Sequence, residues 1–324
     1  MQRLPPQAKQ NSEDFRPHPR ANQLRQGIHM FAYTIQSSGM AIHLYYNPLM
    51  QTHLVFFGSS PFSVVALQKL VLSEKCSVLT VVTTPDKPVG RHLKLTPNPV
   101  KAFAEKHHLP VFTDVHDFLL SDLPANTIAL VAAHGRRLGP KTLSKFNNQV
   151  YVIHPSLLPK YRGPSPLPQQ ILDGVTKTGV TLIQADLGED TGPIVTQEKT
   201  GITSTSTTVT LGVKLFTLGA DLFIKFLLDP NHYHLKPQDN ALASYTHKLT
   251  RANGFLPFAQ FTSALESRPA WLNRIFRAYF PWPGVWTLTP DGKRVKLIQL
   301  HPLQFLLENQ SRLVSLEQLL SASH

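Results

Sequence analysis

The sequence predicts an α/β protein with a doubly wound, mostly parallel sheet, followed by a smaller β-rich domain. Two observations carry this prediction. Short apolar runs alternate with helical patterns from residue 52 to about residue 228, as in sheets whose parallel strands are joined by helices on both faces. Residues 247–324 then show β-type runs around one short helical stretch.

The expected elements follow one another in strand–helix order. The first unit is a strand at 53–57, a tight turn at 58–61 and a helix to about residue 73. Further strands are expected at 77–83, 109–112, 127–133, 149–154, 178–186 and 193–200. Helices are expected near 99–107, 140–146 and 207–228. In the second domain we expect a helix at 269–279 and strands near 285–289 and 294–300.

These patterns divide the chain into four parts. Residues 1–49 are rich in Arg and poor in apolar periodicity, so we expect a flexible N-terminal extension. It is either an organellar targeting peptide or, as we prefer, the result of a start codon assigned upstream of Met50. Residues 50–229 form the predicted sheet domain, 230–246 a linker, and 247–324 the second domain.

Composition limits the class of protein. The hydrophobic content of 42% is that of a packed globular chain, and the net charge of +12 favours a polyanionic partner such as nucleic acid. Cys76 is the only cysteine, so no internal disulfide can form. No apolar stretch is long enough to span a bilayer. We expect a cytoplasmic monomer without a membrane partner, or a protein of the mitochondrial matrix if the first part is a targeting peptide.

His154 and Asp190 are the strongest candidates for chemistry. Each lies in a loop shaped by Gly and Pro beside a strand-like run, in HPSLLPKYRGPSP and DLGEDTGPI. Loops that follow the strands of a parallel sheet converge at one edge, so these two side chains can meet there with the turn at 133–135. An imidazole beside a carboxylate can exchange protons near neutral pH. Taken singly, each is more often structural, as a backbone-bonded histidine or a turn former.

Two kinds of cofactor find little support. The turn at 58–61 is not GxGxxG, which argues against a dinucleotide. His92, His134 and His154 lack close ligand spacing with another His, Cys or Glu, so no metal is expected.

Basic residues gather in one loop and in the second domain. The loop at 84–101 holds Lys87, Arg91, Lys94 and Lys101 against Asp86 alone. Residues 247–324 hold nine Lys and Arg, Arg274 and Arg277 among them, against four acids. Both regions suit phosphate contacts, whereas the aromatic residues between them are individually more often core.

Seven segments, in order, resemble a known family. They are VFFGSSPFSVVALQKL, the loop at 84–101, LVAAHGRRLGP, HPSLLPKYRGPSP, TGVTLIQADLGEDTGPI, KLTRANGFLPF and FRAYFPWPGVW. Together they are similar to methionyl-tRNA formyltransferases from about residue 52 to 300. HPSLLP is shared with other folate-dependent formyltransferases, whereas the 84–101 loop and PWPGVW are more selective. The resemblance implies a Rossmann-like formyltransferase fold that moves a formyl group from 10-formyltetrahydrofolate to initiator methionyl-tRNA.

The resemblance also implies roles for individual residues. His154 and Asp190 match the family's catalytic histidine and aspartate, and Arg91 matches a basic residue of its tRNA-sensing loop. The implied folate-binding residues are Ala133, His134, Gly135, Ser156, Leu157, Leu158, Pro159 and Gly163. The implied tRNA-binding residues are Lys87, Arg91, Lys94, Arg274 and Arg277.

The chain departs from the family pattern at three places. Val152 occupies the position of a catalytic asparagine, and valine cannot donate a hydrogen bond to the formyl oxygen. His134 stands where the family usually has tyrosine. Asn147 and Asn148 precede the strand, so we do not expect them to replace the missing amide. The second domain is also short for the family's five-stranded barrel, so we expect a truncated, oligonucleotide-binding-like fold.

Three hypotheses about function follow. The first is an active methionyl-tRNA formyltransferase, in which His154 accepts a proton and Asp190 orients it. The second is a catalytically weakened tRNA- or folate-binding relative, because of Val152. The third is formyl transfer to a small-molecule amine, against which the basic loop and the second domain argue.

Overall fold

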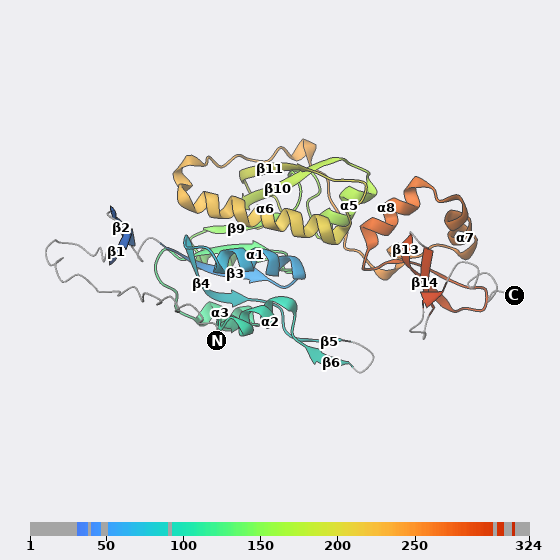
Figure 1. Cartoon of the computed structure of the whole chain (residues 1–324), viewed down its shortest axis with the longest axis horizontal. Coiled ribbons are helices and arrows are strands. Elements are labelled where there is room, and N and C mark those ends of the chain that lie inside the picture. The colour runs from blue at the N-terminus through green and yellow to red at the C-terminus, as the bar shows by residue number, and fades with distance from the viewer. Residues whose placement is uncertain are drawn as a thin grey trace, which may run out of the picture. The chain divides into compact units, whose positions relative to one another are not determined.

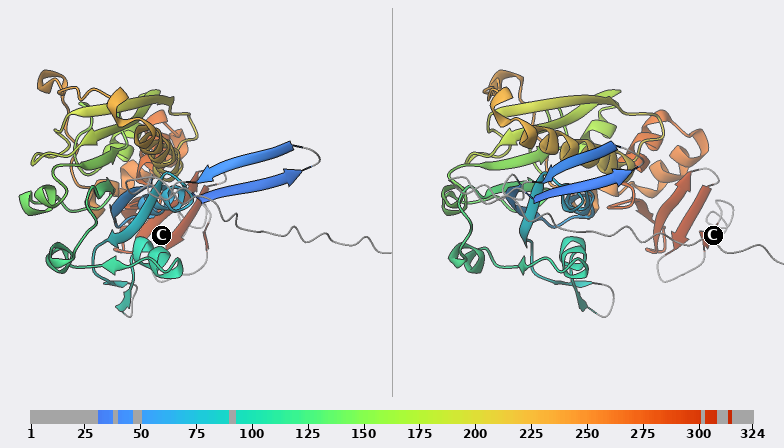
Figure 2. Two further views of the ribbon diagram at one scale, coloured as in Figure 1. Left: turned by 90° about the vertical axis from the view of Figure 1, so that its left-hand side faces the viewer. Right: turned by 60° about the vertical axis from the view of Figure 1, so that its left-hand side comes forward.

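The structure is a computed structural model that describes residues 31–37, 40–46, 51–89, 93–300, 303–307 and 313–314. The chain divides into two units, Met1–Gln51 and Thr52–His324. In the first unit, β1 (Phe31–Ser37) pairs antiparallel with β2 (Met40–Tyr46), as Figure 2 shows. The sequence did not predict these strands, and the flexibility of residues 1–49 stays a prediction.

The second unit is built on a seven-stranded sheet in the order β11-β10-β9-β8-β3-β4-β7 (Figure 1). Its strands are β3 (Thr52–Gly58), β4 (Cys76–Val82), β7 (Val111–Phe112), β8 (Ile128–Ala132), β9 (Val150–His154), β10 (Lys177–Gln184) and β11 (Ile194–Gly201). The pairs from β9 to β7 are parallel, whereas β10 is antiparallel to both β9 and β11. The predicted mostly parallel sheet is confirmed.

Helices cover both faces of this sheet. On one face, α1 (Pro61–Val71), α2 (Pro99–Lys106), α5 (Pro166–Leu172) and α6 (Thr208–Leu228) bury a core that includes Phe56 and Ile153. On the other face, α3 (Val115–Leu120) and α4 (Pro140–Lys145) bury a second core that includes Phe57 and Val150. Neighbouring strand residues point to opposite faces, so the central strands β3 and β8 are apolar on both sides.

The first strand–turn–helix unit forms as predicted. Ser60 caps α1, because its hydroxyl accepts the backbone N–H of Phe62 and Ser63, and Pro61 fixes the first helical residue. The Ser63 hydroxyl also donates to the Ala132 carbonyl over 2.6 Å. This bond ties α1 to the end of β8, beside the expected ligand edge of the sheet.

The basic loop at 84–101 contains a small hairpin. Its strands β5 (Lys87–Val89) and β6 (Lys94–Thr96) pair antiparallel. At the base of the hairpin, Asn98 caps α2 and its amide donates to the Thr84 carbonyl over 2.7 Å. The hairpin is therefore fixed where it leaves the sheet.

The C-terminal part of this unit is smaller. The segment that leads into it holds short 3-10 helices, η2 (Pro230–His232), η3 (Asn240–Leu242) and η4 (Arg251–Gly254). Two helices follow, α7 (Phe258–Ser267) and α8 (Ala270–Tyr279). An antiparallel sheet in the order β12-β13-β14-β15 is formed by Val285–Leu288, Arg294–Leu300, Leu303–Leu307 and Leu313–Val314. The predicted β-rich domain is confirmed, and α7 is an addition.

The longest helix of the described residues, α6, packs against the sheet. Its buried residues include Leu215, Phe216 and Phe223, which contribute to the first core. Among the residues that the structure describes, no helix combines the length and apolarity needed to cross a bilayer.

Candidate active site

His154 is the last residue of β9 and is only 4% exposed. Val150 and Val152 of the same strand pack in the second core, and side chains two residues apart share a face. His154 therefore lies on that face. Its Nε2 is 2.8 Å from the Tyr161 carbonyl oxygen, and because a carbonyl can only accept, Nε2 carries a proton.

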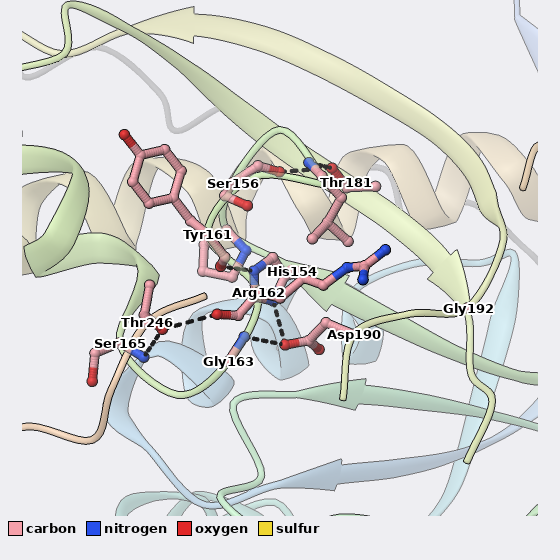
Figure 3. Close-up of polar contacts among 12 residues, drawn as sticks. His154, Ser156, Tyr161, Arg162, Gly163, Ser165, Thr181, Asp190, Gly192 and Thr246 are labelled. Atoms are coloured by element: carbon pink, nitrogen blue, oxygen red, sulfur yellow. Dashed lines mark hydrogen bonds and ion pairs between the residues drawn. The ribbon is translucent and has the colours of Figure 1, made fainter. Parts of the chain in front are cut away.

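Asp190 meets the other side of the same ring. Its Oδ2 lies 3.4 Å from His154 Nδ1 and also accepts the Gly163 backbone N–H over 2.8 Å (Figure 3). Asp190 has a positive φ of 56°, a left-handed conformation that Asp tolerates better than most residues. The structure thus brings the two predicted residues together, on the same side of the sheet.

The route by which Asp190 reaches His154 differs from the one expected. The sequence predicted that both residues follow strands whose ends lie at one edge. Because β10 is antiparallel to β9, its last residue Gln184 pairs with Tyr151 near the start of β9. The loop from 185 to 193 consequently begins away from His154 and returns to it at Asp190.

This geometry favours a charged pair. Burial disfavours a charged ring, but the Asp190 carboxylate and the Tyr161 carbonyl together raise the pKa of His154. Burial likewise opposes ionisation of Asp190, but His154, the Gly163 N–H and Arg162 lower the pKa of that carboxyl. The ring has an acceptor at each nitrogen, so an imidazolium facing a carboxylate satisfies every group.

Val152 lies on the same face of β9 as His154, beside Val131 and Ile183 on the neighbouring strands. Its side chain is partly buried and packs against the second core. Asn147 and Asn148 are exposed before the start of β9, as expected, so neither replaces an amide at this position.

The turn at 133–135 has positive φ at Ala133 and Gly135. His134, however, is buried edge-on against Phe57, with ring centroids 5.7 Å apart, and neither of its nitrogens has a hydrogen-bond partner. Burial, together with the positive charge of Arg136, lowers the pKa of His134 to about 4. The Gly58 backbone opposes this shift but does not form a hydrogen bond with the ring. His134 is therefore a buried, neutral ring near pH 7, and its role in binding a ligand stays a prediction.

The loop after His154 is held largely by its own contacts. The Ser156 hydroxyl donates to the Lys160 carbonyl over 2.6 Å, and the Leu158 side chain is buried. Leu157 packs against Gly179 of β10. Pro159 is partly exposed. These four predicted folate residues shape the loop, and their role in binding a ligand stays a prediction.

Gly163 has a requirement of its own. Its φ is 100°, and a Cβ there would lie 2.9 Å from the Thr246 carbonyl oxygen, so only glycine fits. Its N–H holds Asp190, which makes Gly163 part of the support for the carboxylate.

Sequence reasoning missed Arg162, which is only 1% exposed. Its guanidinium donates to Gln238, Asn240 and Tyr245, all in the predicted linker. An arginine between a tyrosine and a glycine in a polar loop carries no sequence signal of burial, and its partners lie more than 70 positions away.

The predicted tRNA-binding residues fall into different surroundings. Lys87 and Lys94 are exposed on the hairpin, whereas Arg91 lies outside the described residues. Arg277 donates to the Ser206 carbonyl and to Asn273, over 2.7 and 2.6 Å, and so connects α8 to the residues before α6. Arg274 is partly buried with its side chain beside Gly174. The hairpin therefore offers freer cations than α8 does.

Within the described ranges, no three His, Cys, Asp or Glu side chains are grouped closely enough to hold a metal ion.

Comparison with known proteins gives consistent results. Residues 52–227 match the family described as formyl transferase. The methionyl-tRNA formyltransferase of Roseiflexus sp. (strain RS-1) is 37% identical over 261 residues, covering 77% of this chain and 76% of the relative. That of Halothermothrix orenii is 34% identical over 279 residues, covering 84% and 85%.

A solved structure shows the same fold. The N-formyltransferase from Helicobacter canadensis, in complex with folinic acid and dTDP-3-aminofucose, has a TM-score of 0.52 at 20% identity, covering 77% of this chain and 87% of the other. At that identity, the likeness concerns the fold alone.

Proposed function

This chain belongs to the formyl transferase family, and from that premise we propose that it transfers a formyl group from 10-formyltetrahydrofolate to the amine of methionyl-initiator tRNA. The observation that carries the proposal is the buried His154–Asp190 pair, with 3.4 Å between Nδ1 and Oδ2. The similarity to methionyl-tRNA formyltransferases over 77% of the chain supports the choice of substrate.

In the proposed reaction, the methionyl amine attacks the formyl carbon and a tetrahedral intermediate forms. The neutral form of His154 accepts the proton that the amine loses, and Asp190 stabilises the resulting imidazolium. When the carbon–nitrogen bond to the folate breaks, N10 of the folate takes a proton, so the reaction consumes none. We propose that the backbone at 133–135 holds the pterin and that the loop at 156–163 borders the cleft.

The exposed cations of the hairpin suit an RNA partner. Lys87 and Lys94 are exposed, while Lys101 at its base is paired with Asp86 over 2.9 Å. Pairing removes the one acidic charge of this loop from competition with phosphate. Lys87 and Lys94 are therefore the proposed phosphate contacts.

The test is formylation of charged initiator tRNA by the purified protein with 10-formyltetrahydrofolate as donor. Product should accumulate in proportion to enzyme and disappear in His154→Gln. A protein that forms no product above the no-enzyme background, although it is folded, is not an active formyltransferase. An amino sugar nucleotide and glycinamide ribonucleotide, assayed in parallel, separate tRNA from small-molecule acceptors.

A second candidate function rests on Val152. With no amide at this position, the protein could retain binding of folate or tRNA at a reduced rate of transfer, because one preorganised donor is typically worth about 10²–10³ in rate. Folate binding measured by calorimetry, together with slow or absent turnover, would favour this alternative.

A further inference from the structure

The predicted linker is bonded to both loops of the site instead of running free between two domains. At one end, Ile194 and Lys236 exchange backbone hydrogen bonds of 2.8 and 2.9 Å. At the other, the Arg162 N–H donates to the Ser244 carbonyl and the Thr246 N–H donates to the Arg162 carbonyl, each over 2.8 Å. Residues 236–246 therefore lie against the loops that carry His154 and Asp190.

Gln238 is the point at which this segment meets the Asp190 loop. Its Oε1 accepts from Arg162 Nε and Nη2 over 3.1 and 2.8 Å. Its Nε2 donates to the carbonyls of Asp190 and Gly192 over 2.8 and 2.7 Å. A guanidinium can only donate and a carbonyl can only accept, so one orientation of the amide satisfies all four contacts.

Arg162 fixes that orientation. Its remaining side-chain bonds go to Asn240 Oδ1 and Tyr245 OH, both over 2.9 Å, so its charge is held by neutral acceptors. A buried cation needs partners for its donors, and these contacts engage four of the five N–H groups of the guanidinium. The guanidinium is also close enough to favour the charged form of Asp190.

Asp190 needs such support because of its backbone. A positive φ of 56° is sparsely populated for a residue with a side chain and persists where the surroundings hold it. The carboxylate is held by the Gly163 N–H and His154, and the carbonyl of the same residue is held by Gln238. Asp190 is thus held through both its side chain and its main chain.

We propose that Gln238 is a positioning residue of the site: by donating to the Asp190 and Gly192 carbonyls it holds the Asp190 carboxylate against His154, with Arg162 setting the orientation of the amide. Gln238 touches no reacting atom in this scheme. Its kinetic consequence rests on the proposed function, whereas its effect on the protonation of His154 does not.

The charged groups around His154 are few, which makes its titration a direct readout. Asp190 and Glu189 approach it from the loop after β10, and Arg162 acts on Asp190 from the loop after β9. The Tyr161 carbonyl faces Nε2. Displacement of Asp190 removes the nearest of these charges.

The experiment is an NMR titration of the His154 ring in wild type, Gln238→Ala and Gln238→Glu, with the signal assigned by its loss in His154→Gln. Gln238→Ala removes all four bonds. Gln238→Glu keeps an oxygen that accepts from Arg162. It replaces the Nε2 donor with a second oxygen, which faces the Asp190 and Gly192 carbonyls. The matched control is Gln184→Ala, which removes a glutamine whose side chain donates to the backbone carbonyl of the exposed Asn148.

We expect the His154 midpoint to fall in Gln238→Ala and to stay unchanged in Gln184→Ala. Formyl transfer should fall roughly tenfold or more in kcat for both Gln238 variants, since small displacements of catalytic groups have effects of this size. KM for the charged tRNA should stay within about twofold, because the hairpin is untouched. Gln238→Glu should also lose this rate while staying folded, because its contact with Arg162 remains but a carboxylate cannot donate to the Asp190 and Gly192 carbonyls.

Two results would overturn the proposal. One is a Gln238→Ala protein that is folded and titrates at the wild-type midpoint. The other is a loss of activity that accompanies a lower Tm in Gln238→Ala and is absent in Gln238→Glu. A wild-type protein without transferase activity counts against the proposed function alone, and the titration still decides the role of Gln238.

Discussion

Replacing Val152 with asparagine should increase the rate of formyl transfer. The β9 pleat puts residues 152 and 154 on one face, roughly 7 Å apart along the strand, a gap that suits a formyl group and its attacking amine. His154 is at the end of this face with its ring held by Asp190 and Tyr161. An amide at 152 would add a donor for the formyl oxygen at the point where negative charge develops.

The magnitude follows from what the site already contains. A single preorganised donor is worth about 10²–10³ in kcat. The imidazolium of His154 already places positive charge on the same face, so the lower value, about 10²-fold, is expected. The cost falls on stability: about 1 kcal/mol is lost with the partly buried valine and about 1 kcal/mol comes from desolvating the amide. For a chain of this size, these losses lower Tm by roughly 3 °C.

Steady-state formylation of charged initiator tRNA, with melting curves for each variant, measures both quantities. Val152→Ala is the control, because it opens the same space without supplying a donor. A gain in Val152→Asn that is absent in Val152→Ala supports the reasoning. An equal gain in both would show that space limits the rate, and an already fast wild type that asparagine does not improve would show that another group donates to the oxygen.

Three further predictions come from the titratable groups. The rate of formyl transfer should rise with pH through the raised pKa of His154, because only the neutral ring accepts a proton. Asp190→Asn should move this rise to lower pH and reduce kcat. A pH profile that does not move in this variant would contradict the pairing of His154 with Asp190. Because His134 titrates at about 4 when folded and near 6.5 when unfolded, the unfolded chain binds more protons between these values, so stability should fall by about 1.4 kcal/mol per unit as pH drops through this window. Denaturant titrations should find this loss reduced in His134→Phe, and an equally steep loss in that variant would assign it to other groups. Burial raises the pKa of the Cys76 thiol to about 11, so a thiol reagent should label it only after unfolding, and rapid labelling of the native protein would disprove its burial.

The sheet was predictable because its signals are local. Apolar runs bounded by Gly and Pro predicted strands within a few residues of those observed, as at β9 (Val150–His154) and β10 (Lys177–Gln184). The direction of β10 was not predictable in this way, since a strand buried on both faces has the same composition in either direction. The sequence analysis missed the short helix α3, Val115–Leu120.

The candidate site was likewise predictable only where the signal is local in the sequence. His154 and Asp190 were found because their residue types suit proton transfer and their loops carry Gly and Pro. Arg162 and Gln238 were missed because their importance lies in contacts between distant segments, 76 positions apart. The burial of His134 against Phe57 was not predictable from the sequence, and its role at the ligand site stays a prediction. The sequence therefore indicated which residues could transfer protons. The residues that position them, and the burial of His134, could be identified only from the structure.

The arrangement around Asp190 bears on whether the site is active. A protein that only binds folate needs a cleft, whereas this chain also keeps a carboxylate and an imidazole in a largely buried pair, 3.4 Å apart. Burying two charges is costly unless every group is satisfied, and here Gly163, Tyr161, Gln238 and Arg162 supply the partners. Holding one carboxylate in a fixed orientation against an imidazole is needed for proton transfer and is not needed for binding alone. The pair therefore favours an enzyme whose rate is lowered, rather than abolished, by the valine beside it.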